Sequence, residues 1–125
     1  MGIHQKPIIT IPEIDPPKVL EIEDQVIGDG AECSSGQQIS VDYTGVSWSN
    51  GAEFDSSWSR GDVFTFSVGI GQVIEGWDQG CIGMKVGGRR KLTIPPDMAY
   101  GKQGAGGIIG ADETLVFVVD LRSIG

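Results

Sequence analysis

The sequence predicts an α+β domain in which an antiparallel sheet covers one short helix. Two observations lead to this fold class. Apolar and polar residues alternate along several short segments, which is the pattern of strands with one buried face. A single segment, residues 73–82, has helical character, and a helix of this length needs a sheet to cover its apolar side. Many of the 20 glycines fall between the predicted strands, where turns are expected.

The strands are predicted from a period of two. Alternation is clearest in residues 39–44, where Ile39, Val41 and Tyr43 share one face. Four more strands are predicted over residues 19–27, 64–68, 90–94 and 114–121. The dipeptide Asn50-Gly51 is the strongest short signal for a hairpin turn, so the chain is expected to reverse direction there.

The predicted helix carries the most informative residue of the chain. Trp77 lies at its centre, and Gly76 and Gly80 lower its intrinsic helix propensity. Indole is the largest apolar side chain and is rarely buried completely. A tryptophan on a short helix inside a β-rich domain therefore indicates the floor of a concave, apolar site. The glycine-rich loop over residues 101–113 has a length that is often functional in a compact domain.

The chain divides into an arm and one domain. Residues 1–18 contain Pro7, Pro12, Pro16 and Pro17, which favour an extended arm over a helix. A packed tail and a disordered tail both remain open for this segment. Residues 19–125 form the predicted domain, and this length is enough for one hydrophobic core but not for two.

Charge and hydropathy exclude two classes of partner. The net charge is −8 and the longest basic run is Arg89-Arg90-Lys91, so nucleic-acid binding is disfavoured. We expect that run to lie on a solvated strand face. No apolar run approaches the roughly 20 residues that a membrane helix needs, and the N-terminus lacks the apolar core of a signal peptide. The chain is therefore expected to be a cytoplasmic monomer with no nucleic acid or membrane partner.

Histidine and cysteine usage limits the chemistry. His4 is the sole histidine and lies in the arm, which excludes a Ser-His or Cys-His pair inside the domain. Cys33 and Cys81 lie far apart and lack the spacing of a metal site. We expect two reduced thiols, with one disulfide as the alternative. Neither a metal nor another cofactor is predicted.

Seven ordered sequence blocks carry a family resemblance. They are Val41-Asp42-Tyr43-Thr44-Gly45, Phe54-Asp55-Ser56-Ser57, Phe64-Thr65-Phe66, Gln72-Val73-Ile74-Glu75-Gly76-Trp77, Lys91-Leu92-Thr93-Ile94-Pro95, Ala99-Tyr100-Gly101 and Thr114-Leu115-Val116-Phe117. With these blocks the chain resembles the small, single-domain, bacterial-like FKBP-type peptidyl-prolyl cis-trans isomerases. The resemblance implies a curved antiparallel sheet of five or six strands wrapped around one short α-helix, with Trp77 as the floor of a pocket.

The resemblance also implies the site and the reaction, which is rotation about X–Pro peptide bonds in protein substrates without covalent chemistry. Catalytic roles are implied for Phe54, Asp55, Ile74, Trp77 and Tyr100. The implied ligand-binding residues are Tyr43, Phe54, Asp55, Arg60, Phe64, Gln72, Val73, Ile74, Trp77, Tyr100, Ile108, Ile109 and Phe117. Arg60 is expected beside Asp55. The expected partners are flexible or unfolded proline-containing polypeptides and macrolides such as tacrolimus or rapamycin.

Two features stand apart from the family pattern. Many members have His-Pro before the Gly-Ile-Ile of the rim loop, where this chain has Ala105-Gly106 before Gly107. This difference keeps an alternative open, a binding module for macrolides or proline motifs without catalysis. Trp48 and Trp58 lie outside the family's pocket positions, and we expect both to be exposed loop aromatics.

Overall fold

Six strands and three short helices make up the fold of residues 5–125. The computed structural model describes residues 5–125, so His4 lies outside the described residues. The strands are β1 (Glu21–Val26), β2 (Gln38–Ser47), β3 (Glu53–Ser56), β4 (Phe64–Ser67), β5 (Arg89–Ile94) and β6 (Leu115–Ile124). The helices are α1 (Ser57–Arg60), α2 (Glu75–Gly80) and the one-turn 3₁₀ helix η1 (Pro96–Met98).

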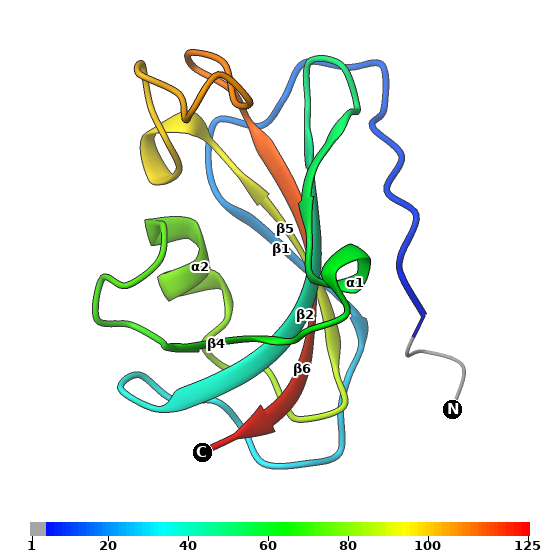
Figure 1. Cartoon of the computed structure of the whole chain (residues 1–125), viewed down its shortest axis with the longest axis vertical. Helices are drawn as coiled ribbons and strands as arrows, with labels where there is room; N and C mark the ends of the chain where they lie inside the picture. The colour runs from blue at the N-terminus through cyan, green and yellow to red at the C-terminus, as the bar shows by residue number, and fades with distance from the viewer. Residues whose placement is uncertain (1–4) are drawn as a thin grey trace.

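All strand pairs are antiparallel, in the order β1-β5-β6-β2-β3, and β4 also pairs with β2. The ten-residue β2 holds two partners on one edge, because β4 pairs with its beginning and β3 with its end. The sheet curves around α2, while α1 and the N-terminal arm lie on the opposite side (Figure 1). The structure confirms the predicted α+β class and the antiparallel sheet wrapped around a short helix.

The core lies between the concave face and α2. Alternate residues of the two long strands point into it, which are Ile39, Val41 and Tyr43 of β2 and Leu115, Phe117, Val119 and Leu121 of β6. Leu92 and Ile94 of β5 complete the floor under α2 and are fully buried. The alternation of apolar and polar residues along each strand therefore indicates which face of that strand is buried.

Two tryptophans depart from their predicted exposure, because both are half-buried. The indole N–H of Trp48 donates a hydrogen bond to the carbonyl oxygen of Ile14 in the arm, at 3.2 Å. Trp58 belongs to α1, and its indole nitrogen is shielded from solvent. The predicted exposure is wrong for both, because the side of the sheet opposite α2 is covered by α1 and the arm. The predicted loop position is wrong for Trp58, whereas Trp48 does lie in the turn after β2.

The basic run is also not a solvated face. Arg89 pairs with the buried Asp120, at 2.6 Å between Nε and Oδ1. Arg90 is 8% exposed, and its Nε lies 2.6 Å from Asp24 Oδ1. Its Nη1 donates to the carbonyl oxygens of Gly80 and Ile82, both at 2.9 Å. Arg90 thus satisfies carbonyls at the C-terminal end of α2, where a helix leaves them without partners.

Cys33 and Cys81 are both free and buried, as the sequence predicts for reduced thiols. Burial raises the pKa of the Cys81 thiol to about 12, and the neighbouring Cys33 adds to the effect. Burial likewise raises the pKa of Cys33. Among residues 5–125 there is no group of three or more potential metal ligands, and none of the helices there is long and apolar enough to span a bilayer.

Replacing Arg90 by Met tests its role at the end of α2. The variant leaves the carbonyls of Gly80 and Ile82 and the Asp24 carboxylate without their partner, so the free energy of unfolding should fall by about 3–5 kcal/mol in urea denaturation at pH 7. Lys91→Met, which removes the same charge from a partly exposed neighbour, should change it by no more than about 0.5 kcal/mol. Equal losses in the two variants would contradict the capping role.

The buried thiols predict a pH dependence. An unfolded cysteine has a pKa of about 8.5, so above that pH the unfolded chain releases protons that the folded chain retains, and stability should fall as the pH rises. The free energy of unfolding measured at pH 7.5 and pH 10 should therefore be lower at pH 10. At pH 8 a disulfide reagent should modify the folded protein far more slowly than the urea-unfolded protein. Equal rates would show that the thiols are accessible in the folded state.

Candidate functional site

A cavity of about 300 Å³ opens on the concave side of the sheet above α2. Its walls come from six separate parts of the chain, and most of them are aromatic or aliphatic. The lining residues are Tyr43, Phe54, Asp55, Phe64, Gln72, Val73, Ile74, Trp77, Tyr100 and Phe117. This composition suits an apolar ligand held in one orientation by a few polar groups.

The floor of the cavity depends on close contact between α2 and β5. A Cβ atom on Gly76 would lie 2.5 Å from Cγ2 of Ile94, and one on Gly80 would lie 2.7 Å from Cδ2 of Leu92. Both distances are too short for a real contact. The two glycines weaken α2 as an isolated helix, but they allow it to lie directly on the strand. This depth places Trp77 in the core.

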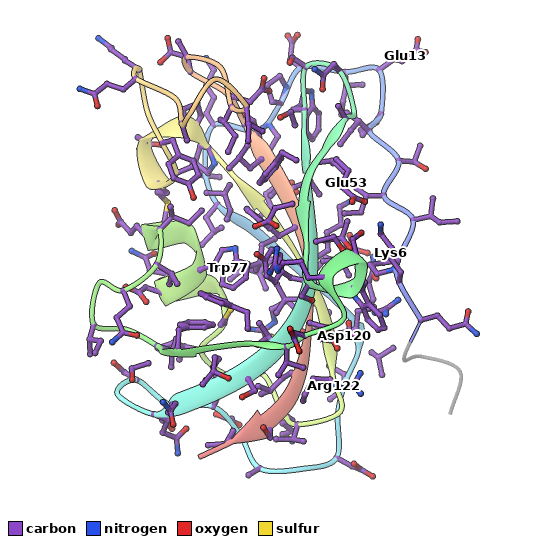
Figure 2. The ribbon with its side chains drawn as sticks, viewed as in Figure 1. Lys6, Glu13, Glu53, Trp77, Asp120 and Arg122 are labelled. Carbon is purple, nitrogen blue, oxygen red and sulfur yellow. The ribbon has the colours of Figure 1, made fainter. Side chains whose placement is uncertain are left out.

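Trp77 is the centre of an aromatic cluster. The indole is 4% exposed and points from α2 toward the sheet (Figure 2). Its ring centroid lies 4.9 Å from that of Tyr43 and 5.2 Å from that of Phe117, both nearly perpendicular. Phe66 lies behind it at 5.5 Å. Edge-to-face pairs of this kind stabilise aromatic clusters by about 0.5–1.5 kcal/mol each beyond their buried area, so the floor is rigid.

A β-bulge brings two consecutive residues of β3 to the cavity. Gly45 is opposite Asp55, whereas the next residue of β2, Val46, is opposite Glu53, so Phe54 is the extra residue. In a regular strand Phe54 and Asp55 would point to opposite faces. With the bulge, both line the cavity.

The polar part of the wall is a cluster of Tyr43, Asp55 and Arg60. The Tyr43 hydroxyl donates to Asp55 Oδ2 at 2.5 Å, and Arg60 forms an ion pair with the same carboxylate. Arg60 Nη2 also donates to the Tyr43 hydroxyl at 3.1 Å. Burial, together with the hydrogen bond to Asp55, raises the pKa of Tyr43, so the phenol stays protonated. The hydrogen bonds to Tyr43 and Asp55 raise the pKa of Arg60.

The loop between β4 and α2 forms another wall and is held by side chains. The Asp78 carboxylate of α2 accepts hydrogen bonds from the backbone N–H groups of Gly69 and Gly71, both at 2.8 Å. Gln72 Oε1 accepts one from the N–H of Ser67, also at 2.8 Å. These bonds fix the segment that ends in Val73 and therefore the direction in which α2 begins.

The rim differs from the predicted set of residues. Tyr100 is 41% exposed and lines the cavity, and its pKa is raised by burial and by the charge of Asp55. Ile108 is 67% exposed, whereas Ile109 is buried in the core. Neither isoleucine is among the described residues that line the cavity. Arg60 does not line it either, and is linked to the cavity wall only through its contacts with Tyr43 and Asp55.

One residue behind the site had no signal in the sequence. The Ser57 hydroxyl accepts a hydrogen bond from the backbone N–H of Tyr43 at 2.8 Å and donates one to Asp42 Oδ1 at 2.7 Å. It joins the start of α1 to β2 beside the polar cluster. Serine is common at such turns, so its presence alone predicts no particular partner. The hydrogen-bond partners of Ser57 are seen only in the folded structure, where segments distant in the sequence meet.

Comparison with known proteins agrees with this geometry. A family model of the FKBP-type peptidyl-prolyl cis-trans isomerases matches residues 30–122. The chain belongs to this family. The predicted resemblance is therefore confirmed, and the chain is a peptidyl-prolyl isomerase of the FKBP type.

Individual FKBP relatives match over nearly the whole chain. An FK506-binding protein from Streptomyces anulatus is 53% identical over 96% of this chain and 98% of its own length. A probable FK506-binding protein from Corynebacterium glutamicum is 47% identical over 95% of this chain and 98% of its own. The crystal structure of AtFKBP13 superimposes with a TM-score of 0.78 at 40% identity, covering 86% of this chain and 98% of that one.

Gly76→Ala tests the close contact that places Trp77 in this FKBP-type isomerase. In an isolated helix this change stabilises by about 1 kcal/mol. Here the added methyl overlaps Ile94, and overpacking costs about 1–3 kcal/mol, so the free energy of unfolding should fall. Gln79→Ala, on the exposed side of α2, is the control and should stay close to the wild type. A stabilised Gly76→Ala protein would show that α2 has room to move off β5.

Proposed function

We propose that this FKBP-type isomerase binds a flexible proline-containing polypeptide in the Trp77 cavity and lowers the barrier to rotation about its X–Pro bond there. The observation that supports the proposal is the cavity itself. Aromatic walls surround a volume of about 300 Å³, and Asp55, the charged residue among those that line it, is engaged by three donors, which are Tyr43, Arg60 and the backbone N–H of Ser56. A proline ring with the preceding residue is an apolar ligand that suits such a space.

The reaction needs no nucleophile. Partial double-bond character gives peptide rotation a barrier of about 18–20 kcal/mol. The planar amide has more charge separation than the twisted one, because twisting removes the resonance. A water-poor, apolar cavity therefore stabilises the twisted amide relative to the planar one. Each 1.4 kcal/mol or so of such preference accelerates rotation about tenfold.

Three donors at the cavity would orient the substrate. The backbone N–H of Ile74, the Tyr100 hydroxyl and the Gln72 amide nitrogen make no hydrogen bond to other described residues. Ile74 precedes α2, and its carbonyl oxygen accepts from Trp77 N at 3.0 Å, which anchors the residue to the first turn of the helix. In the proposed complex these groups donate to substrate carbonyl oxygens, and Trp77 supports the pyrrolidine ring.

Asp55 supplies a fixed negative charge beside the rotating amide. Its two oxygens are held by Tyr43 and Arg60, so the carboxylate cannot turn toward solvent without breaking both contacts. A charge that is already oriented acts on the amide dipole without a cost of reorganisation. We propose this electrostatic role, with Phe54 as the adjacent apolar wall.

Macrolide binding is the second proposed function of the same cavity. Relatives of this chain are named FK506-binding proteins. The apolar walls and the free donors that would take a proline segment would equally take tacrolimus or rapamycin. Because the rim loop has Ala105-Gly106, we keep the alternative that the cavity binds macrolides or proline motifs without catalysing isomerisation. An arm of residues 1–18 before an isomerase domain of residues 19–125, a cytoplasmic location, and a monomer without membrane or nucleic-acid partner all remain predictions.

Asp55→Ala tests the proposed role of the carboxylate. We expect kcat/KM for a proline-containing peptide to fall by at least about tenfold, because the cavity loses its oriented charge while its apolar walls remain. A protease-coupled assay measures this loss, and urea denaturation confirms that the variant is folded. Asp29→Ala, at an exposed turn, is the matched control and should retain full activity.

The same assay separates the two functions. Activity of the wild type together with tacrolimus binding would support both. If the folded protein bound tacrolimus but did not accelerate isomerisation above the uncatalysed rate, only the binding function would be supported. If Asp55→Ala kept the wild-type kcat/KM, the carboxylate would have a structural role only.

A further inference from the structure

One lysine of the N-terminal arm joins the two elements that flank the polar cluster. Lys6 Nζ lies 2.9 Å from Glu53 Oε1 and 3.2 Å from Oε2, and it donates to Ser59 Oγ at 3.0 Å. Glu53 is the first residue of β3, and Ser59 belongs to α1. The lysine therefore bridges a strand and a helix from outside the cavity.

The arm around Lys6 is itself attached to the sheet. Arg89 Nη2 donates to the carbonyl oxygen of Gln5 at 2.5 Å. The same guanidinium is held by Asp120, which is 2% exposed, through two bonds of 2.6 and 2.9 Å. Further along the arm, the Trp48 indole binds the Ile14 carbonyl. Lys6 thus follows a backbone group that is bonded to Arg89 of β5 and, through Arg89, is linked to Asp120 of β6.

The two residues that Lys6 contacts are close in sequence to the polar cluster. Glu53 precedes Asp55 by two positions, and Ser59 directly precedes Arg60. Asp55 of β3 and Arg60 of α1 form an ion pair with each other across the junction at which the strand ends and the helix begins. Lys6 and Trp77 lie on opposite sides of the sheet (Figure 2). The lysine therefore acts on the β3–α1 junction from the side opposite the cavity, and it is not among the residues that line the cavity.

We propose that Lys6 is a positioning residue for the Asp55–Arg60 pair. It holds β3 and α1 in the spacing at which Arg60 keeps Asp55 directed to the cavity, so that the arm contributes to catalysis from outside the site. This inference rests on the proposed function of Asp55. Because Lys6 and Glu53 are 41% and 38% exposed, the contact is salt-sensitive, and its loss should change the rate by a factor of about two to five.

The test compares three full-length variants in the isomerase assay at low and high salt. Lys6→Met should lower kcat/KM about two- to fivefold at low salt. Lys6→Arg should recover most of the loss, because it keeps the positive charge. Lys18→Met removes the same charge from an exposed part of the chain and should match the wild type. At about 1 M salt the wild type should approach Lys6→Met, since screening weakens the exposed pair.

A measurement independent of turnover separates positioning from a general loss of stability. The side-chain N–H resonances of Arg60 should shift in Lys6→Met and not in Lys18→Met, at a temperature where urea curves show all variants folded. A rate loss without an Arg60 shift, or a shift without a rate loss, would overturn the proposal, as would the absence of both. If Asp55→Ala has wild-type activity, the proposed role of Asp55 fails and the role of Lys6 fails with it, while isomerisation in the Trp77 cavity still stands. If Asp55→Ala loses activity and Lys6→Met does not, only the role of Lys6 fails.

Discussion

The close contact of α2 with β5 is the constraint on which the site depends. Because Gly76 and Gly80 have no side chains, the helix backbone lies against Ile94 and Leu92. This contact sets how deeply Trp77 enters the aromatic cluster and where the peptide group of Ile74 meets the cavity. The loop before α2 is tied to the helix by Asp78, so it follows the helix position. A larger residue at either glycine would move all of these groups together.

The two sides of the sheet contribute different things to the site. The concave side supplies shape, through aromatic rings packed edge to face around Trp77. The opposite side supplies orientation, through the polar contacts of Ser57, Asp42 and Lys6 that hold β3 and α1. Asp55 lies where the two meet, with its charge at the cavity and its backbone in a strand held from behind. The proposed mechanism uses both contributions, because it has no nucleophile and relies on fixed surfaces and a fixed charge.

Local patterns predicted the parts of the fold that depend on local burial. Alternation in residues 39–44 and 114–121 marked strands, because each strand has one face in the core. The same reasoning missed β3, where the bulge at Phe54 breaks the alternation. It also misjudged Arg90, since a basic residue in a strand is usually solvated, and the helix carbonyls that it binds come from another part of the chain.

The sequence by itself determined the fold class, the family and most residues of the cavity wall, because the periodicity and the ordered blocks are properties of the linear chain. Only the tertiary structure decided which groups act on one another. It placed Ile109 in the core and Ile108 in solvent, and it put the half-buried Trp58 in a helix. It also brought Lys6 to Glu53 of β3 and Ser59 of α1, the two elements that contain Asp55 and Arg60. The physical reason is that these contacts join segments far apart in the chain, and their energies depend on distance and burial, which no local pattern encodes.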